Sequence, residues 1–361
     1  MTFYQELQLN QAGSKMVINK SASRKEKLRH IAIYLFKIFI TIAFCMAVVI
    51  GYSKIFGSEN SIVGVVVLLC VMTFRFADFG IHTSHGLHSL FLMFLILAFG
   101  PRLDNASGLG LELLIHFLCI LGILVLGCHN VLMSNQSTLV LGYLLLYGYD
   151  ATGRQYLLRL LGIALGAILT GVVFYRNHRH QKYKRGFGHL FREFDLRSSR
   201  SKWQICLALG ISTSIFLAGL LHIPRAMWVG IAVMSVLLPF REDLQQRVRG
   251  RIPGNIAGGL LFLVIYTLLP ESFYSYIGII GGIGVGLSAS YRWQAVFNSL
   301  GAISIAVGVL GLPGAIFFRI FNNAFGAVYG FLFERFFQGT VDGLCSPSWK
   351  AKGFSRTPFG K

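Results

Sequence analysis

Residues 227–239 read MWVGIAVMSVLLP and residues 255–269 read NIAGGLLFLVIYTLL, and the charged stretch FREDLQQRVRGRIPG separates them at residues 240–254. Neither apolar run contains a charged residue. A helix that crosses the hydrocarbon core of a bilayer needs roughly 20 predominantly apolar residues. The pattern therefore predicts two membrane helices that are joined by a charged stretch on one side of the membrane.

The whole chain repeats this pattern. It has 361 residues, of which 54% are hydrophobic and only 13% are charged. A soluble domain carries roughly twice that share of charged residues. The composition therefore predicts an all-α polytopic membrane protein. The sequence contains no P-loop, nucleophile elbow or dinucleotide fingerprint, so we expect neither an enzyme nor a cofactor.

About 12 transmembrane helices are expected. They correspond to the apolar ranges 30–52, 61–75, 87–100, 108–127, 132–149, 156–176, 203–222, 226–240, 254–270, 273–290, 294–311 and 313–336. The ranges 61–75 and 226–240 are short for a bilayer-spanning helix. Short segments at matching places in two halves point to a binding site, unless each helix simply continues as a polar extension.

The net charge of +19 is distributed unevenly along the chain. If the N-terminus lies inside, most of the 33 Lys and Arg residues fall on the inner side of the membrane. The exceptions are Lys54, Arg102, Arg154 and Arg225 on the outer side and Lys37, Arg159 and Arg319 within apolar runs. The positive-inside rule then predicts a multi-pass plasma membrane protein with both termini in the cytoplasm. Anionic lipid is expected as a partner of the inner face, and nucleic acid is not.

Two pairs of segments resemble each other. SIVGVVVLLCVMTFR at 61–75 matches MWVGIAVMSVLLPFR at 227–241, and RLLGIALGAILTG at 159–171 matches RIFNNAFGAVYGF at 319–331. The order and the approximate spacing are kept. We interpret the chain as two tandem halves of six helices each, related as parallel repeats.

The expected organisation follows from these repeats. It comprises a cytoplasmic basic tail at 1–29, a six-helix half at 30–176, a basic cytoplasmic linker at 177–202, a second six-helix half at 203–337 and a basic tail at 338–361. The linker is expected either as a short amphipathic helix on the inner membrane surface or as a solvated connection. A homo-oligomer is possible from the sequence.

Residues 225–261 resemble the core motif of the fusaric-acid-resistance (FUSC) family, which includes aromatic-acid exporters. Arg225, Ala226 and Trp228 match the R-A-x-W entry of that motif, and Arg247 and Gly250 match its later part. Where the family usually has threonine, this chain has Arg251. The corresponding turn of the first half, FADFGIHTSHG at 76–86, has histidines in place of arginines.

The resemblance implies a short form without the large soluble domain of many members. It further implies an exporter of small organic or aromatic acids that is driven by the proton-motive force. It does not identify the substrate.

Two arginines recur within apolar runs of the two halves. Arg159 and Arg319 could each bind an exported carboxylate through paired hydrogen bonds. Their alternatives are snorkelling to the interface or pairing with an acid. Asn298, Asn322 and Asn323 are further candidates for substrate binding, although interhelical hydrogen bonding is the more common use of such amides.

A carboxyl group and an imidazole are spaced for proton transfer. Glu112 and His116 are four residues apart and share one helix face. Such a pair could couple transport to a proton gradient. The alternative is that Glu112 pairs with Arg159 or lies at the outer rim.

The charged corners at 74–75 and 240–254 are candidates for an inner gate. Its expected residues are Arg75, Arg241, Arg247 and Gly250. We expect Pro253 to lie just before the helix that begins at residue 254. His82, His85 and His88 have a spacing of three, but no complete ligand set surrounds them, so no metal site is expected.

The leading hypothesis is thus a secondary transporter that exports small organic anions with proton coupling. One alternative is a non-transporting envelope or scaffold protein with a basic cytoplasmic face. Another is a passive anion channel of the same architecture.

Overall fold

The computed structural model describes residues 2–9, 11–239, 242–288 and 290–344, and this part of the chain contains helices and turns but no strand. The long helices are α3 (Arg24–Phe56), α5 (Thr83–Asn105), α6 (Leu109–Gly127), α8 (Gly153–His178), α10 (Ser199–Leu220), α12 (Glu242–Leu268) and α14 (Tyr291–Leu344). The shorter helices are α1 (Phe3–Gln8), α2 (Gln11–Asn19), α4 (Ser61–Phe74), α7 (Gln136–Gly148), α9 (Gly188–Arg192), α11 (Ala226–Val236) and α13 (Ile277–Leu287). Short 3-10 turns lie at Ser58–Asn60, Val131–Met133 and Glu271–Tyr276.

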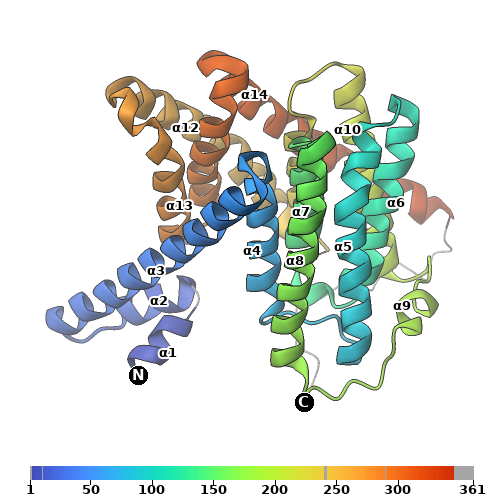
Figure 1. Ribbon diagram of the computed structural model, residues 1–361, viewed down its shortest axis with the longest axis horizontal. Helices are drawn as coiled ribbons and strands as arrows, with labels where there is room; N and C mark the ends of the chain where they lie inside the picture. The colour runs from blue at the N-terminus through green and yellow to red at the C-terminus, as the bar shows by residue number, and fades with distance from the viewer. Residues whose placement is uncertain (1, 10, 240–241, 289, 345–361) are drawn as a thin grey trace. The chain divides into compact units, whose positions relative to one another are not determined.

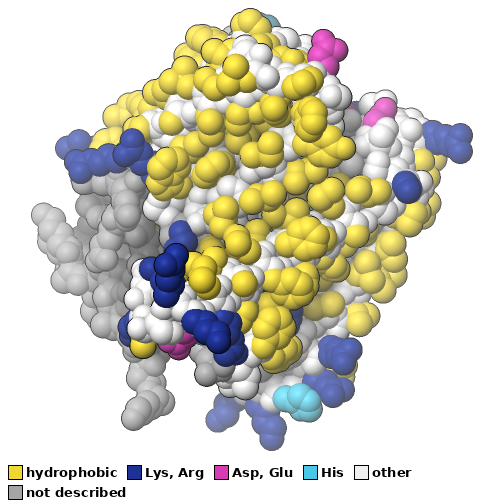
Figure 2. Space-filling model, turned by 90° about the vertical axis from the view of Figure 1, so that its left-hand side faces the viewer, with side chains coloured by type: hydrophobic (Ala, Val, Ile, Leu, Met, Phe, Trp, Pro, Cys, Tyr) yellow, Lys and Arg dark blue, Asp and Glu magenta, His cyan; other side chains and the backbone are white. Residues whose placement is uncertain are grey.

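Seven helices in the described part are long and apolar enough to cross a membrane. They are Arg24–Phe56, Thr83–Asn105, Leu109–Gly127, Gly153–His178, Ser199–Leu220, Arg247–Leu268 and Tyr291–Thr340. Figure 2 shows hydrophobic side chains spread across one face of the molecule, while Lys and Arg side chains lie mostly toward its margins. Exposed apolar surface of this extent suits contact with lipid. The fold is that of a helical membrane protein.

Each of the twelve expected ranges overlaps a helix, but the lengths differ. α7 has 13 residues and α13 has 11, and the ranges 294–311 and 313–336 both lie in α14. Gly311 interrupts α14 with φ 68° and ψ 168°, a conformation that glycine adopts readily. Twelve transmembrane helices and a tandem repeat therefore stay predictions.

The two short helices are short in the structure as well. α4 has 14 residues and α11 has 11. At a rise of 1.5 Å per residue they measure about 21 and 16 Å, against a hydrocarbon thickness of about 30 Å. Neither helix continues as a regular polar extension, because α4 ends at Phe74 and α11 ends at Val236.

The charged stretch after α11 corrects one prediction. α12 begins at Glu242 and contains Pro253, so the expected start at residue 254 is wrong. Proline removes one backbone donor from a helix. Close packing against α14 outweighs this loss, because a Cβ at Gly254 would lie 2.8 Å from Ala295 Cβ, and one at Gly258 would lie 2.5 Å from Val296 O.

Contacts divide the chain into two compact units. Unit 1 contains Met1–Ala47 and Arg249–Asn323, and unit 2 contains Val48–Val248 and Ala324–Lys361. In unit 2, α4, α5, α7 and α8 lie side by side, and α6 packs against α5 and α10 (Figure 1). α10, the first helix of the expected second half, thus packs with helices of the first half. The expected domain boundaries stay predictions.

Gly166 and Gly326, which align in the matching sequence segments, have similar surroundings in unit 2. A Cβ at Gly166 of α8 would collide with Val67 of α4. A Cβ at Gly326 of α14 would lie 2.7 Å from Ala232 Cβ of α11. In each case a glycine lets a long helix approach the short helix of its own expected half.

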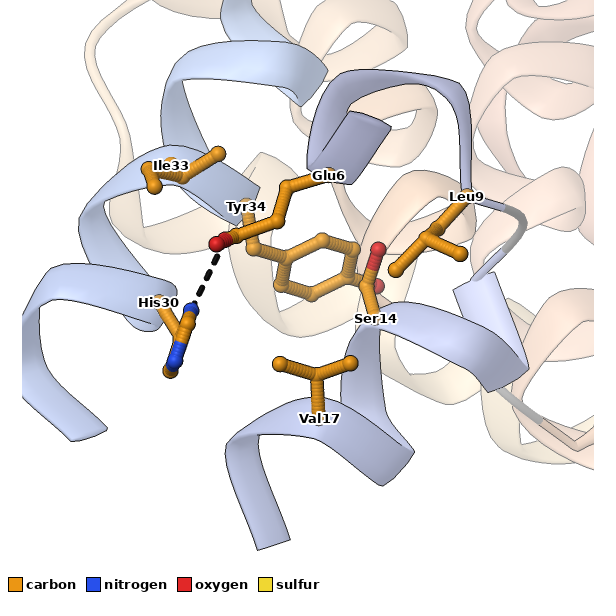
Figure 3. Close-up of a pocket in the computed structure, with 7 residues that line it drawn as sticks. All are labelled: Glu6, Leu9, Ser14, Val17, His30, Ile33 and Tyr34. Atoms are coloured by element: carbon orange, nitrogen blue, oxygen red, sulfur yellow. Dashed lines mark hydrogen bonds and ion pairs between the residues drawn. The ribbon is translucent and has the colours of Figure 1, made fainter. Parts of the chain in front are cut away.

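The N-terminal segment of unit 1 is helical and packed rather than an extended tail. Lys37 Nζ of α3 donates to Leu9 O at 3.0 Å. His30 Nδ1 of α3 lies 2.8 Å from Glu6 Oε2 of α1, at a small pocket that Figure 3 shows. These contacts attach α1 and α2 to the beginning of α3.

The basic linker packs against unit 2. α9 has only five residues, and its Leu190 is 2% exposed within the core of unit 2. Phe191 and Leu196 are instead exposed. His82 N donates to Arg185 O at 2.8 Å. The linker thus contains one short helix whose Leu190 is buried, and both expected forms stay predictions.

Candidate functional site

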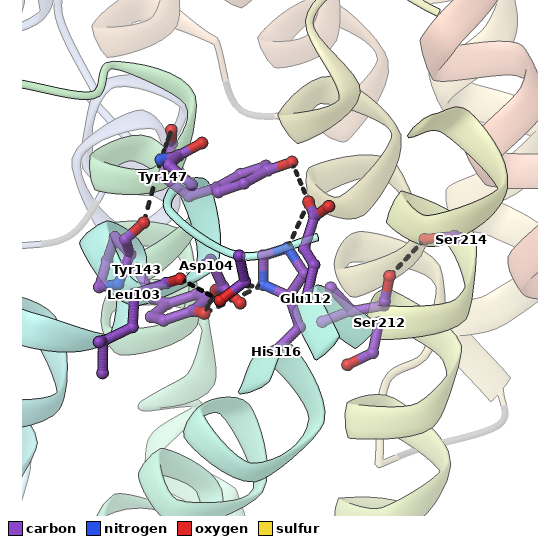
Figure 4. Close-up of polar contacts among 12 residues, drawn as sticks. Leu103, Asp104, Glu112, His116, Tyr143, Tyr147, Ser212 and Ser214 are labelled. Carbon is purple, nitrogen blue, oxygen red and sulfur yellow. Dashed lines mark hydrogen bonds and ion pairs between the residues drawn. The ribbon is translucent and has the colours of Figure 1, made fainter. Parts of the chain in front are cut away.

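The expected pair of α6 meets a second carboxylate. His116 Nε2 lies 3.5 Å from Glu112 Oε1, and His116 Nδ1 lies 2.7 Å from Asp104 Oδ2 of α5. His116 and Asp104 have 0% exposed side chains, whereas the Glu112 side chain is 16% exposed. The structure thus brings Glu112 and His116 together and adds Asp104, as Figure 4 shows.

Two tyrosines of α7 complete this group. Tyr143 Oη donates to Asp104 Oδ2 and lies 3.0 Å from His116 Nδ1. Tyr147 Oη donates to Glu112 Oε1 at 2.6 Å. We call these five residues the acid–histidine cluster. Its members come from three neighbouring helices of unit 2 (Figure 4).

The close approach of α5 to its neighbours explains why Asp104 reaches the cluster. A Cβ at Gly100 would lie 2.8 Å from Cys119 Sγ and 3.0 Å from Tyr143 Cε2. Asp104 follows one helical turn later and therefore faces the same neighbours. Asn105 Nδ2 donates to Tyr147 O at 3.0 Å and ties the end of α5 to α7.

Asp104 was missed because the expected range ended at residue 100, before Pro101. α5 instead continues through Pro101 to Asn105. Asp104 thus lies in the last turn of α5 and Glu112 in the first turn of α6. The sequence could have revealed Asp104, because it lies only four residues beyond Gly100. A proline removes a single backbone donor and does not always end a helix.

The cluster can bind and exchange protons. One imidazole lies between two carboxylates, and histidine titrates more readily than other side chains near neutral pH. Ionisable groups inside apolar helices are costly and usually functional. In the described part of the chain, Asp104 Oδ1 and His116 Nε2 make no hydrogen bond.

Arg159 of α8 binds the ends of neighbouring elements in unit 2. It is 3% exposed, so it does not snorkel to the surface. Its Nε donates to Asn60 Oδ1 at 3.1 Å, and its other nitrogens donate to the carbonyls of Glu59 and Leu146 at 3.4 Å. These groups lie just before α4 and in the last turn of α7. The contacts give Arg159 a stabilising role, while its role in substrate binding stays a prediction.

A second buried group lies in unit 1. Arg251 of α12 is 8% exposed, and it donates to Asn323 Oδ1 at 3.0 Å and to Tyr291 Oη at 2.8 Å. Asn323 Nδ2 donates to Arg319 O at 2.7 Å, and Arg319 is also 8% exposed. We call Arg251, Tyr291, Arg319 and Asn323 the arginine–amide cluster.

Other amides near this cluster differ in burial. Asn322 is 0% exposed on α14, next to Asn323. Asn255 Nδ2 donates to Arg251 O at 2.8 Å, and Ser299 Oγ donates to Asn255 Oδ1 at 2.9 Å. Asn298 is exposed, so the structure does not bring it into this network. Sequence reasoning noted Arg251 only as a departure from the family motif and did not foresee its place beside Asn323.

The expected gate residues lie on different elements, at the end of α4 and on α12. Arg75 is exposed at the end of α4, and its guanidinium carbon lies 5.0 Å from the centre of the Phe76 ring. Arg247 and Gly250 are three residues apart on α12. Arg241 lies outside the described residues. The inner gate stays a prediction.

Charged side chains pair within the linker, and one of them also contacts His129 before α7. Glu193 lies 3.3 Å from Arg185 Nε and 3.6 Å from Arg200 Nη2. Burial, followed by the nearby Arg200 charge, lowers the pKa of His129 to about 4. The contact of 3.2 Å between His129 Nε2 and Glu193 therefore involves a neutral imidazole near neutral pH.

Tyr183 makes a further contact of the linker with unit 2. Its hydroxyl donates to Asp78 Oδ2 at 2.9 Å. Burial, followed by this hydrogen bond, raises the pKa of Tyr183 to about 12. The hydroxyl therefore stays protonated and can keep donating.

His82, His85 and His88 lie in a row, with ring centres 5.7 and 6.3 Å apart. Among the residues that the structure describes, no group of three or more His, Cys, Asp or Glu side chains is arranged to hold a metal ion.

Comparison with known families identifies one region. Residues 212–333 match the family model described as fusaric acid resistance protein-like. The match contains the whole motif at 225–261 and confirms the family resemblance predicted from the sequence. Neither a curated protein nor a solved structure shows significant similarity to the chain. The match and the apolar helices together indicate a membrane protein of a transport or resistance type.

Proposed function

We propose that this chain, whose residues 212–333 are fusaric acid resistance protein-like, is a secondary transporter that exports small organic or aromatic acid anions. Export is driven by the proton-motive force across the plasma membrane. Both termini lie in the cytoplasm, where the basic segments contact anionic lipid.

The observation that carries this proposal is the burial of ionisable side chains of both signs in span-length apolar helices. Asp104 and His116 are 0% exposed in α5 and α6, and Arg251 and Arg319 are 8% exposed in α12 and α14. By insertion scales a charged side chain costs about 3 kcal/mol at the centre of a membrane helix and less toward its ends, where Asp104 lies in α5. Their retention supports roles in moving protons and anions.

The arginine–amide cluster is the proposed anion site. A guanidinium binds a carboxylate through two parallel hydrogen bonds, and amide groups add further donors. Arg319, Asn322 and Asn323 are the previously expected residues, and Arg251 joins them through its bond to Asn323. Arg159 and Asn298 stay candidates for a second position along the path.

The test is export of radiolabelled aromatic acids from cells and from proteoliposomes. A deletion strain grown against a panel of weak organic acids first selects the substrate. Export by the wild-type chain should collapse when a protonophore is added. Arg319→Gln should lower export about tenfold, because a lost charge-assisted hydrogen bond is worth roughly 1.5 kcal/mol or more.

The matched control is Arg292→Gln, because Arg292 is exposed near the start of the same helix. That variant should export like the wild type. Export that persists undiminished with a protonophore would overturn proton coupling. Unchanged export by Arg319→Gln would overturn the anion site.

Two alternatives have distinct outcomes in the same assay. A passive anion channel of this architecture would give flux that follows membrane potential without a proton gradient. A non-transporting scaffold would give no flux of any panel compound, and its basic cytoplasmic face would instead bind protein partners or anionic vesicles.

A further inference from the structure

Asp104 is a buried carboxylate to which the sequence assigned no role. Its side chain is 0% exposed, and its Oδ2 faces both Tyr143 Oη and His116 Nδ1. Its other oxygen, Oδ1, has no hydrogen-bond partner in the described part of the chain. An incompletely satisfied carboxylate is costly inside an apolar environment. An ionisable residue that is this costly inside a membrane protein usually has a function.

The three ionisable groups form a row of increasing burial. Glu112 is 16% exposed, whereas His116 and Asp104 are fully buried. One imidazole nitrogen of His116 faces each carboxylate, as Figure 4 shows. Within this row, only the side chain of Glu112 is accessible from outside.

We infer that Glu112, His116 and Asp104 form a proton relay in which Glu112 takes up the proton and Asp104 holds it inside unit 2. The inference rests on the proposed function, because it names the residue at which proton coupling acts. Asp104 is then the proton-holding residue, and Tyr143 positions its carboxylate.

The relay step conserves protons and charge. Before it, Glu112 is protonated, His116 carries one proton on Nδ1, and Asp104 is ionised. Glu112 gives its proton to His116 Nε2 while Nδ1 gives its proton to Asp104 Oδ2. Afterwards Glu112 is ionised, His116 is neutral, and Asp104 is protonated. The 3.5 Å gap between Glu112 and Nε2 must shorten by about 0.5 Å to reach ordinary hydrogen-bond length.

The neighbouring helices surround the relay with few charges. α6 contributes Cys119 near Gly100, and α10 contributes the hydroxyls of Ser212 and Ser214, which donate to carbonyls within α10. The remaining groups are Tyr143 and Tyr147 of α7, Tyr156 and Arg159 of α8, and the pair of Arg102 with Asp150 at 2.7 Å. Arg159 is bound to helix-end carbonyls and Arg102 to Asp150, so the cations near the relay already have partners.

Infrared spectroscopy tests proton binding without any need for transport. The full-length chain is reconstituted in lipid, and difference spectra are recorded across pH in the region of the protonated carboxyl stretch. The wild type should show a buried carboxyl band that Asp104→Asn removes. Glu59→Gln, at an exposed acid, should leave that band unchanged. Retention of the whole band in Asp104→Asn would overturn the inference.

A second variant keeps the test decisive if Asp104→Asn fails to fold. Tyr143→Phe removes one hydrogen-bond donor to Asp104 and keeps the ring. The carboxyl band should then shift in frequency, because Tyr143 no longer donates to Asp104 Oδ2. A band that does not shift would contradict the assignment to Asp104.

Transport assays separate this inference from the proposed function. Asp104→Asn should lower proton-driven export roughly 100-fold, while exchange of internal for external substrate, which needs no net proton movement, should persist. If Asp104→Asn exports as fast as the wild type under a proton gradient, the relay is wrong but the proposed function is not. A wild-type chain without any proton-dependent export would overturn the proposed function, and the infrared bands would still decide whether Asp104 holds a proton.

Discussion

Arg159 and Arg319 occupy matching places in the two expected halves, yet their surroundings differ. Arg159 in unit 2 binds Asn60 and the carbonyls of two helix ends. Arg319 in unit 1 lies on α14 beside Asn323, which also accepts a hydrogen bond from Arg251. The first arginine uses its guanidinium to connect secondary-structure elements, whereas the second is buried on α14 one turn before Asn323, which binds its backbone carbonyl. Residues that recur in sequence can therefore have different surroundings in the two units.

The largest expected effect concerns the stability of unit 2. Arg159→Ala removes the donor to Asn60 Oδ1 and to the carbonyls of Leu146, which is buried, and Glu59, which is not, so the free energy of unfolding should fall by roughly 3 kcal/mol. Thermal unfolding of the purified chain in detergent measures this change. Arg154→Ala, at an exposed arginine of the same helix, is the control and should unfold like the wild type. If Arg159→Ala unfolds like this control, Arg159 and Arg319 do not differ in the way described.

The next effect concerns the packing that frames the arginine–amide cluster in unit 1. In Gly258→Ala the new methyl group would lie 2.5 Å from Val296 O and 2.7 Å from Ser299 Cβ. Overpacking of this kind costs about 1–3 kcal/mol, so both the unfolding temperature and export should decrease. Gly301→Ala on α14 is the matched control, because nothing lies within 4 Å of its new methyl group. Equal behaviour of the two variants would show that close contact at Gly258 is not required.

A smaller effect is expected when Arg251 is replaced by the residue usual in the family. Arg251→Thr removes one buried guanidinium, and the affinity for the exported acid should fall about tenfold, or roughly 1.4 kcal/mol. The concentration dependence of export by proteoliposomes measures this change. Arg249→Thr, at an exposed arginine two residues earlier, should leave the affinity unchanged. A variant Arg251→Thr that keeps the wild-type affinity would restrict the anion site to Arg319 and its neighbours.

The smallest effect tests a part of unit 2 away from Arg159. The pKa of His129 is about 4 in the folded chain and about 6.5 when unfolded. Between these values the unfolded state binds more protons, so stability falls as the pH decreases. The loss between about pH 7 and about pH 5.5 should be about 1 kcal/mol from this group alone. Unfolding of His129→Gln should lack this component, and an identical pH dependence in both chains would refute it.

The apolar runs were sufficient to predict an all-helical membrane protein, because lipid requires long uninterrupted apolar segments. Local patterns were less informative where tertiary packing dominates. Pro253 and Pro101 both suggested helix boundaries, yet α12 and α5 continue through them. In α12 the glycines Gly254 and Gly258 pack so closely against α14 that the helix persists.

The candidate site could be predicted only in part, because it too depends on contacts between helices. Glu112 and His116 were found because residues four apart share a helix face. Asp104 comes from a different helix, and no periodicity within one segment reveals a contact between helices. The bond between Arg251 and Asn323 spans 72 positions of the chain, so it too depends on tertiary packing.

The composition of unit 2 has a consequence for how the chain is made. Unit 2 combines Val48–Val248 with a segment that begins at Ala324. Gly326 of that late segment lies against Ala232 of α11. During synthesis, therefore, α4 to α11 leave the ribosome well before the helix that covers part of α11. Membrane insertion must shelter this uncovered surface until the last helix arrives, so a chain truncated after Asn323 should be a preferred substrate for quality-control proteases.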